Sequence, residues 1–398
     1  MDWSVKPGVV DLFCGCGGLS EGFRKAGFDI LLGIDSDPWA ISTFNRQHQG
    51  KGLLMNIENV DSCQIFDRAG RKDIDVVIGG PPCQAFSTVA VAKWRSLGMP
   101  GTIDHPMNKL YGEFLRLVLE IRPKFFVMEN VERMLSIHGG LIKERIEREL
   151  RNLYSISFDV HNVADFGVPQ YRKRAVVIGN VMGIPNPTLV KTHSNSDPTK
   201  LPYITVRDAI ADLPRLRAGV ARPFVKYSAK RKLSDYAQER RKESDGFHNQ
   251  VARNHNKRDL KIFRMLRPGQ WINDLPERFN PYRKDIFQDK YKKQPWTRPS
   301  STILAHLAKD GLMFIHPDKK QNRSLTPREA ARLQSFDDRY VFEGPRTKQY
   351  VQIGNAVPPI FAKAIAEAVK NSLVPSHSIR MTNASRNHKY HRAGTLNI

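Results

Sequence analysis

Short apolar runs recur along the first half of the chain, at 9–13, 30–35, 76–78, 124–128, 156–160 and 175–179. Their length and their content of valine, isoleucine and phenylalanine predict buried strands. Segments with helical spacing lie between them, at 19–26, 108–121 and 141–153. Strands that alternate with helices predict an α/β fold with a doubly wound, mostly parallel sheet.

The C-terminal part carries clear helix signals. Thr326 is an expected N-cap, Pro327 suits the first helical position, and Glu329 completes a capping box. The segment 352–359 is expected to be a turn that leads into a last helix. One apolar face of that helix comprises Phe361, Ala364, Ile365, Ala368 and Val369.

The stretch from about 184 to 298 has a different character, because it is basic and shows no sustained periodicity. Basic residues are dense between 215 and 232, and Phe224, Tyr227 and Tyr236 are interleaved with them. Such a stretch favours a separate domain that faces a phosphate backbone, although most charge runs are simply solvated surfaces. We therefore divide the chain into 1–183, 184–345, 346–373 and a basic, disordered tail over 374–398.

The charge balance narrows the class of partner. The formal net charge is +23 and the isoelectric point is near 9.9, which favours nucleic acid or an anionic membrane surface. No apolar run is long enough for a membrane-spanning helix, and no signal peptide is evident, so nucleic acid is the better expectation. The four cysteines have neither zinc-site nor disulfide spacing, which indicates free thiols in a reducing, cytoplasmic setting.

Two motifs lie where an open α/β sheet binds ligands, just past the carboxyl ends of strands. Cys83 follows the strand at 76–78 after two glycines and two prolines. A lone cysteine is more often a buried structural residue, but its place after a strand end points to chemistry. The turn 14–18 is glycine-rich, and Asp35 ends the next strand, as in nucleotide-type cofactor sites. Taken alone, this second signal is weak, because many such turns carry glycine for structural reasons.

Together and in this order, the motifs resemble those of the DNA cytosine-5 methyltransferase family over about 8–180 and 296–372. The resemblance implies binding of S-adenosyl-L-methionine by Phe13, Gly15, Gly17, Gly18, Asp35, Asn56, Ile57, Pro82, Asn355, Ala356 and Val357. It implies catalytic roles for Cys83, Glu129, Arg172 and Arg174, and DNA contacts by Gln84 and Ser87. Asn56 stands where the family usually has an acid, and Met107 where it usually has an arginine.

The resemblance also implies a mechanism. The Cys83 thiolate adds to C6 of cytosine, which makes C5 nucleophilic enough to take a methyl group. Glu129, holding a proton, binds N3, and Arg174 holds O2 while Arg172 supports it and a nearby phosphate. The target base must leave the duplex, and the loop 85–105 is expected to close over it.

These implications define the domains and the partners. Residues 1–183 become the catalytic domain, 184–345 a smaller, irregular target-recognition domain, and 346–373 a segment that completes the catalytic domain. The expected substrate is double-stranded DNA, with no metal and no membrane. The resemblance favours a monomeric prokaryotic enzyme, cytoplasmic and associated with the nucleoid, of a restriction–modification system with a cognate endonuclease or of the orphan type.

Two other functions are open at this point. A transfer-RNA cytosine-5 methyltransferase shares this fold, but such enzymes carry a Cys-Phe-Thr element in the recognition region, and no cysteine follows Cys83 here. A catalytically inactive DNA-binding protein is the second alternative. Against it, every residue type that the chemistry requires is present.

Overall fold

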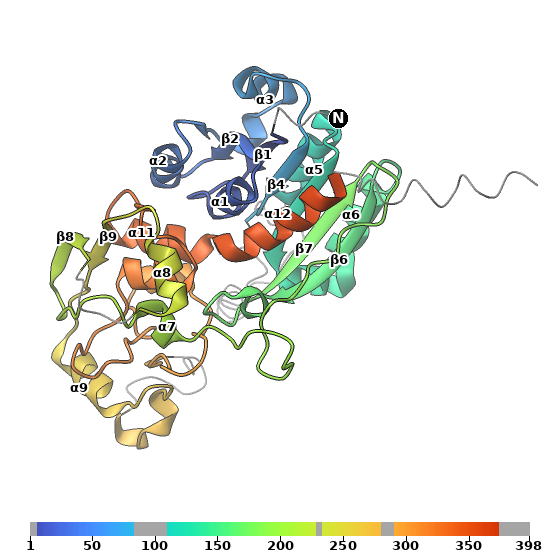
Figure 1. Cartoon of the computed structure of the whole chain (residues 1–398). Coiled ribbons are helices and arrows are strands. Elements are labelled where there is room, and N and C mark those ends of the chain that lie inside the picture. Colours follow the sequence, from blue (N-terminus) through green and yellow to red (C-terminus); the bar gives the residue numbers. More distant parts are fainter. Residues whose placement is uncertain (1–5, 83–109, 228–232, 280–289, 374–398) are drawn as a thin grey trace, which may run out of the picture.

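The computed structural model describes residues 6–82, 110–227, 233–279 and 290–373, and a seven-stranded sheet forms its larger part (Figure 1). The strand order is β3-β2-β1-β4-β5-β7-β6. The strands are β1 (Gly8–Leu12), β2 (Asp29–Asp35), β3 (Gly52–Leu54), β4 (Val76–Gly79), β5 (Phe125–Val131), β6 (Ser155–Asn162) and β7 (Lys173–Asn180). Only β7 runs antiparallel to its neighbours, so the predicted doubly wound, mostly parallel sheet is confirmed.

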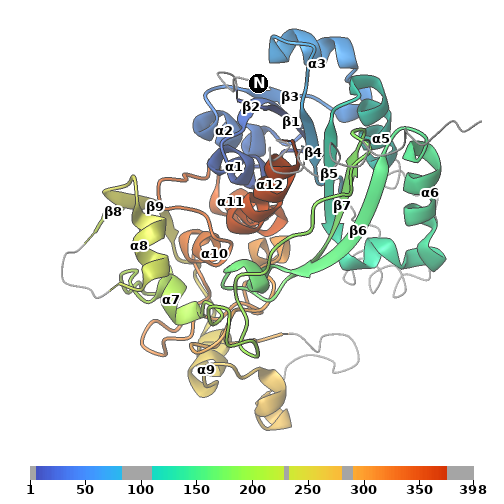
Figure 2. The ribbon, with the colours of Figure 1, turned by 45° about the vertical axis from the view of Figure 1, so that its right-hand side comes forward.

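Helices cover both faces of this sheet because its strands are apolar on both sides. In β4, Val76 and Ile78 point into one core and Val77 into the other, and all three are fully buried. The first core is closed by α1 (Gly18–Lys25), α2 (Pro38–Gln47) and α12 (Pro359–Leu373). The second is closed by α3 (Ser62–Ala69), α5 (Leu110–Ile121) and α6 (Leu141–Leu150) (Figure 2). Burial of each large apolar side chain stabilises this arrangement by roughly 1.5–3 kcal/mol.

The last helix, α12, returns to the beginning of the chain and packs against α1. The two helices approach closely at Gly22, where an added Cβ would lie 2.3 Å from the Cβ of Ala362. Phe361 and Ile365 of α12 enter the same core as Phe23 of α1. The expected apolar face of the last helix is therefore the face that closes the sheet. We call residues 6–183 together with α12 the sheet region.

The middle region, residues 184–355, contains more regular structure than its irregular sequence predicts. Its elements are α7 (Val206–Ile210), β8 (Ala221–Lys226), α8 (Asp235–Arg241), β9 (Gly246–Val251), α9 (Lys257–Met265), α10 (Pro327–Leu333) and α11 (Arg346–Asn355). The helices are short, and several begin at side-chain caps: Ser234 caps α8, Asn256 caps α9, and Thr326 caps α10 in the predicted capping box. The sequence predicted α10 but missed α7, α8 and α9, because helices this short show little periodicity.

Several element boundaries also differ from expectation. Glu129 and Asn130 lie inside β5 rather than after it, and α6 ends at Leu150 rather than at residue 153. The segment 352–359 is not simply a turn, because α11 extends to Asn355. Tyr350 of α11 is buried in the core of the middle region, so α11 packs there and α12 packs on the sheet.

Single turns of 3-10 helix connect many of these elements. They are η1 (Ile57–Asn59), η4 (Glu132–Leu135), η5 (Ile137–Gly140), η6 (Val163–Phe166), η7 (Ile272–Asp274), η8 (Glu277–Phe279) and η9 (Ala305–Ala308). Across the described ranges, no helix has both the length and the apolar character that crossing a membrane requires.

Buried arginines hold the middle region around α10. Arg323, Arg328 and Arg332 are fully buried. Arg323 makes two hydrogen bonds to the Glu329 carboxylate, at 2.6 and 2.7 Å. Arg332 binds Asp338 at 2.6 Å and Asp212 at 3.1 Å, and so ties α10 to the chain after α7. Guanidinium groups remain charged when buried, so the carboxylates compensate the charges of Arg323 and Arg332. Arg328 donates mainly to backbone carbonyls, such as those of His248 and Asp337 at 3.0 Å.

Candidate active site

The glycine turn after β1 leaves open space at the carboxyl edge of the sheet. Phe13, Gly15 and Gly17 have positive φ values of 64°, 54° and 90°, a conformation that favours glycine at the last two positions. The Cys14 amide donates to the Ile34 carbonyl at 2.9 Å and ties the turn to β2. A Cβ added to Gly15 would meet nothing within 4 Å, so a ligand can approach the backbone there.

Asp35, at the end of β2, organises this turn. Its Oδ2 accepts from the Gly15 amide and its Oδ1 from the Asp37 amide, both at 2.8 Å. Burial is the main reason that the pKa of Asp35 is raised. Each carboxylate oxygen has two lone pairs, so Asp35 can still accept a hydrogen bond from a sugar hydroxyl.

Asn56 and Ile57 lie beside Asp35 because the Met55 amide donates to the Asp35 carbonyl at 3.0 Å. The Asn56 Nδ2 donates to Glu58 at 3.0 Å, which leaves the amide oxygen free to act as the predicted acceptor. Ile57 is buried in the core behind the turn. The structure therefore brings these two predicted cofactor residues to the same edge as the glycine turn.

Residues 355–357 approach the same turn from the other end of the chain. A Cβ on Gly18 would lie 2.3 Å from the Val357 carbonyl oxygen, so only glycine permits this approach. Ala356 and Val357 are buried, whereas Asn355 is exposed. These predicted cofactor residues are thus neighbours in space, although more than 300 positions separate them in the sequence.

Asp11, near the end of β1, is a further candidate to which the sequence pattern assigned no role. It is almost fully buried, and Ser20 Oγ donates to its Oδ2 at 2.5 Å. Its Oδ1 has no hydrogen-bond partner among the described residues, and burial raises the pKa of Asp11 to about 7. A buried carboxylate oxygen without a partner suits a cationic ligand. The residues present therefore fit S-adenosyl-L-methionine, which carries an ammonium group, a sulfonium group and ribose hydroxyls.

Glu129 and Arg174 form an ion pair at the carboxyl ends of β4 and β5. The Arg174 Nε lies 2.8 Å from Glu129 Oε1, and both side chains are about nine-tenths buried. Burial lowers the pKa of Arg174, and the charge of Glu129 counteracts this effect. A Cβ on Gly80 would lie 3.4 Å from Glu129 Oε2, so the end of β4 passes beside the carboxylate.

Asn130 fixes the chain that leads toward the cysteine. Its Nδ2 donates to the Pro81 carbonyl at 3.0 Å, which holds the exit of β4 against β5. Pro82 is the last described residue before a gap. Three of the predicted site residues, Cys83, Gln84 and Ser87, lie outside the described residues, as do the predicted loop 85–105 and Met107.

Arg172 occupies a different environment from the one we expected. It is 3% exposed, and its guanidinium donates to the carbonyls of Ile303 (2.8 Å), Gly354 (3.1 Å) and Ala356 (3.4 Å). A buried guanidinium that is bound to backbone carbonyls is not placed to contact a phosphate. The expected contact between Arg172 and a DNA phosphate is therefore wrong. Arg172 instead joins the start of β7 to the segment before η9 and to the end of α11.

Gln170 makes a second connection of this kind, which the sequence did not reveal. Its Nε2 donates to the Leu333 carbonyl and to Gln334, and its Oε1 accepts from the Ile303 amide at 2.7 Å. Gln170 is fully buried. Gln170 and Arg172 therefore connect the sheet region to the middle region, whereas Arg174, two residues further along, faces Glu129.

Two of the aromatic residues in the basic stretch also have structural roles. Tyr236 is buried, and its hydroxyl donates to the Arg332 carbonyl at 2.6 Å. Tyr227 donates to Asp338 at 2.5 Å and lies under the Arg241 guanidinium. Only Phe224 is substantially exposed, so the expected pattern of aromatic residues facing a phosphate backbone is not confirmed for the two tyrosines.

Comparisons with known proteins agree on one family. The family of C-5 cytosine-specific DNA methylases matches residues 8–371. The Type II methyltransferase M.Bpa9945I of Bacillus paralicheniformis is 33% identical over 93% of this chain and its own full length. The Type II methyltransferase M1.HphI of Haemophilus parahaemolyticus is 36% identical over 90% of this chain and 86% of its own.

A solved structure shows the same arrangement of elements. It belongs to an Escherichia coli protein described as a DNA modification methyltransferase encoded within a prophage. The TM-score is 0.71 at 25% identity, and the alignment covers 92% of this chain and 99% of that one. The chain therefore belongs to the C-5 cytosine-specific DNA methylase family, and it is a DNA cytosine-5 methyltransferase whose methyl donor is S-adenosyl-L-methionine.

Proposed function

We propose that Cys83, Glu129 and Arg174 act together on a cytosine that has left the DNA duplex. The observation that carries this proposal is the Glu129–Arg174 pair beside the end of β4, with Asn130 holding the Pro81 carbonyl. Cys83 follows Pro81 by two residues. A nucleophile, a carboxyl group and a guanidinium would therefore surround one small polar ring.

Each of the three groups has a separate task. The Cys83 thiolate adds to C6, and electron density moves to C5, N3 and O2. Arg174 stabilises the negative charge that develops at O2, and Glu129 donates a proton to N3. The base would draw Arg174 toward O2 and thus away from the Glu129 carboxyl group. After methyl transfer a base removes the C5 proton and Cys83 is eliminated.

The cofactor is proposed to bind over the glycine turn. When bound, S-adenosyl-L-methionine supplies an electrophilic methyl carbon. Asp35 would accept from ribose hydroxyls, Asn56 from the adenine amino group, and Asp11 from the ammonium group. Phe13, Gly15, Gly17, Gly18, Ile57, Pro82, Asn355, Ala356 and Val357 would complete the binding surface, in agreement with the open space at Gly15.

Arg172 is proposed as a positioning residue. Its bonds to Ile303, Gly354 and Ala356 hold the start of β7 relative to the cofactor residues 355–357. Because Arg174 lies two residues further along β7, the same bonds set the position of the catalytic guanidinium. Replacement of Arg172 should therefore disturb both cofactor binding and catalysis.

The middle region is proposed as the part that recognises DNA, and Gln84 and Ser87 as further DNA contacts. The high positive charge of the chain supports this division. We also propose that the enzyme acts as a monomer within a restriction–modification system, where it protects a site that a cognate endonuclease cleaves. A monomeric enzyme predicts one protein molecule in each protein–DNA complex. A role in restriction–modification predicts that methylated DNA resists the cognate endonuclease.

The test is transfer of labelled methyl groups to genomic DNA and to transfer RNA, followed by bisulfite sequencing. The expected result is label in DNA at cytosines of one short motif, and none with Cys83→Ser. Glu129→Ala should lower kcat by about 10²–10⁴ and leave cofactor binding intact. Glu132→Ala is a matched control, because Glu132 is an exposed glutamate that pairs with Lys173 at 3.4 Å. Label in RNA alone, or full activity of Cys83→Ser, would contradict the proposal.

A further inference from the structure

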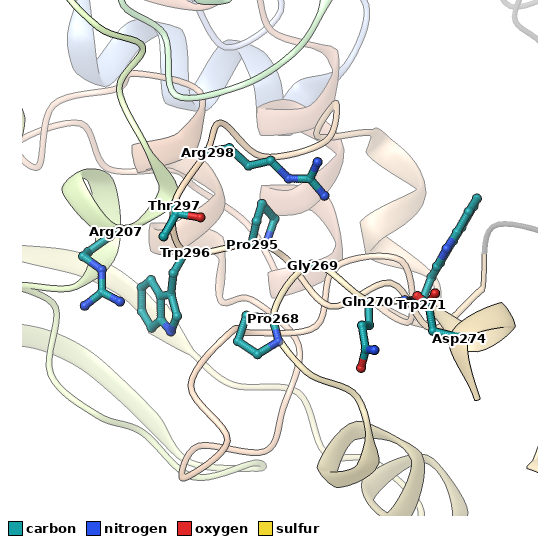
Figure 3. Close-up of a pocket in the computed structure, with 10 residues that line it drawn as sticks. All are labelled: Arg207, Pro268, Gly269, Gln270, Trp271, Asp274, Pro295, Trp296, Thr297 and Arg298. Atoms are coloured by element: carbon teal, nitrogen blue, oxygen red, sulfur yellow. Dashed lines mark hydrogen bonds between the residues drawn. The ribbon is translucent and has the colours of Figure 1, made fainter. Parts of the chain in front are cut away.

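A groove in the middle region, remote in sequence from every catalytic motif, has the chemistry of a base-reading site. Its cavity volume is about 750 Å³, and ten residues from three segments line it (Figure 3). Arg207 and Trp296 lie at one end, Gln270, Trp271 and Asp274 lie at the other, and Arg298 lies on the rim. We call it the tryptophan groove.

Arg207 is held in a fixed orientation. Its guanidinium lies over the Trp296 ring, 5.1 Å from the ring centroid. The backbone beneath it is also fixed, because the Arg207 amide donates to the Trp296 carbonyl and the Val206 amide to the Arg298 carbonyl, both at 3.1 Å. A guanidinium stacked on an aromatic ring leaves its N–H edge available, and that edge matches two acceptors side by side.

The charges on the groove are available for a ligand. Neither Arg207 nor Arg298 has an ion-pair partner among the residues that the structure describes, and both are exposed. At the far end, Lys292 lies over the Trp271 ring at 5.1 Å. These cations distinguish the groove from the interior of the middle region, where the buried arginines are already paired with carboxylates.

The carboxylate of Asp274 favours a base rather than a phosphate as the ligand of the groove. Its Oδ2 accepts from the Trp271 amide at 2.8 Å, which leaves acceptor capacity on the carboxylate. A carboxylate repels a phosphate, but it can accept from the amino group of cytosine, while arginine pairs with O6 and N7 of guanine. The groove therefore offers groups of both kinds that pair with base edges, an arginine donor at one end and a carboxylate acceptor at the other.

The groove is also near enough to the catalytic pair to act on the same DNA. Ser300, two residues after Arg298, forms a bridge to Gln170, four residues before Arg174. With about 3.3 Å per residue and about 4.8 Å between strands, the Cα atoms of Arg298 and Arg174 lie within about 25 Å. That length corresponds to about seven base pairs at roughly 3.4 Å each.

We propose that the tryptophan groove reads a guanine in the recognition site, with Arg207 as the reading residue, Trp296 as its support and Arg298 as a neighbouring DNA contact. This inference rests on the proposed role of the middle region in DNA recognition. It assigns specificity at one base pair to residues that take no part in the methyl-transfer chemistry.

The test is methylation of genomic DNA by Arg207→Lys, with the motif mapped at single-base resolution. Lysine keeps the charge but cannot form the two-pronged contact. The expected result is loss of preference at one G·C position, with discrimination there falling about tenfold or more, and an almost unchanged salt dependence of DNA binding. Trp296→Leu should weaken the preference at the same base pair, whereas Trp296→Phe, which keeps an aromatic surface, should retain most of that preference.

Arg222→Lys is the matched control, because Arg222 is an exposed arginine of β8 that does not line the groove. It should leave the motif unchanged. Three results with Arg207→Lys would overturn the proposal: an unchanged motif, a loss of preference at an A·T pair, or DNA binding that is weaker for all sequences and less dependent on salt. The last result would indicate a phosphate contact. If the wild-type protein methylates no DNA at all, the proposed function fails instead, so the two failures are distinguishable.

Discussion

The sheet region and the middle region are stabilised by different forces. In the sheet region, apolar helices cover both faces of the sheet, and side chains such as Val76 and Val77 are fully buried on opposite faces. In the middle region, the largest fully buried side chains are Arg323, Arg328 and Arg332. Apolar burial has little directional preference, whereas a buried guanidinium requires carboxylates or other hydrogen-bond acceptors at particular positions. Charge pairs can therefore hold short elements and long connections in one arrangement where strands and long helices are few.

The largest expected effect comes from breaking this charge network. Arg332→Met should lower the free energy of unfolding by about 3–5 kcal/mol, because Asp212 and Asp338 lose their shared partner inside the protein. Denaturant unfolding measures the loss, and hydrogen exchange should show it mainly in α7, α8 and α10 rather than in the sheet.

Arg215→Met is the control for this change. Arg215 also pairs with a carboxylate, Asp318 at 3.0 Å, but its side chain is 64% exposed. Its removal should cost about 0–1 kcal/mol. Equal losses for the two variants, or exchange that increases first in the sheet, would contradict the idea that buried arginines hold the middle region.

A smaller effect concerns the buried carboxyl group of Asp11 in the sheet region. Asp11 ionises near pH 4 in the unfolded chain, whereas its pKa is about 7 in the folded protein. Its contribution to stability is therefore full below pH 4 and is lost as the pH rises through 7. At about 1.4 kcal/mol per pH unit, the loss is up to about 4 kcal/mol.

Asp11→Asn removes this titration and keeps an acceptor for Ser20. Unfolding free energies measured from pH 4 to 8 without cofactor should therefore fall less steeply with pH in the variant than in the wild type. Identical slopes would show that Asp11 is not the group responsible. Bound S-adenosyl-L-methionine should also flatten the wild-type curve, because a cation beside Oδ1 favours the charged form.

The smallest of the three effects concerns the place where α12 closes the sheet region. Gly22→Ala would bring a methyl group 2.3 Å from the Ala362 Cβ and 2.5 Å from the Lys363 amide, so the helices must separate slightly. Overpacking of this kind costs typically about 1–3 kcal/mol. Thermal unfolding measures the cost, and Gly50→Ala is a useful comparison, since its positive φ of 77° strains alanine without any neighbour within 4 Å. A larger loss for Gly50→Ala would mean that the close helix contact is unimportant.

Sequence patterns predicted the sheet region well and the middle region poorly, for the same physical reason. In the sheet region, the spacing of apolar residues indicates which faces are buried. One strand has Val76, Val77 and Ile78 in succession, and one helix has Phe114 and Leu117 one turn apart. The arginines that organise the middle region look like surface charge in a sequence. Some of their partners, such as Asp212 for Arg332, lie more than 100 positions away.

In the candidate site, too, the sequence indicated some residues correctly and could not predict the contacts of others. Glycine spacing and strand ends indicated Gly15, Gly18 and Asp35, and the structure brings the three to one edge of the sheet. The burial of Arg172 against three carbonyls could not be predicted, because those carbonyls come from segments about 130 and 180 positions further along the chain. A backbone carbonyl carries no sequence signature, so only the fold reveals such a contact.

The most direct test of the account uses DNA in which the target cytosine is replaced by 5-fluorocytosine. Fluorine at C5 cannot leave as a proton does, so a cysteine that has added to C6 cannot be eliminated after methyl transfer. The account predicts a protein–DNA complex that survives denaturation, requires S-adenosyl-L-methionine, is absent with Cys83→Ser, and contains the DNA on the peptide with Cys83. A complex that forms equally with Cys83→Ser, or no complex with an enzyme that methylates normal DNA, would contradict it.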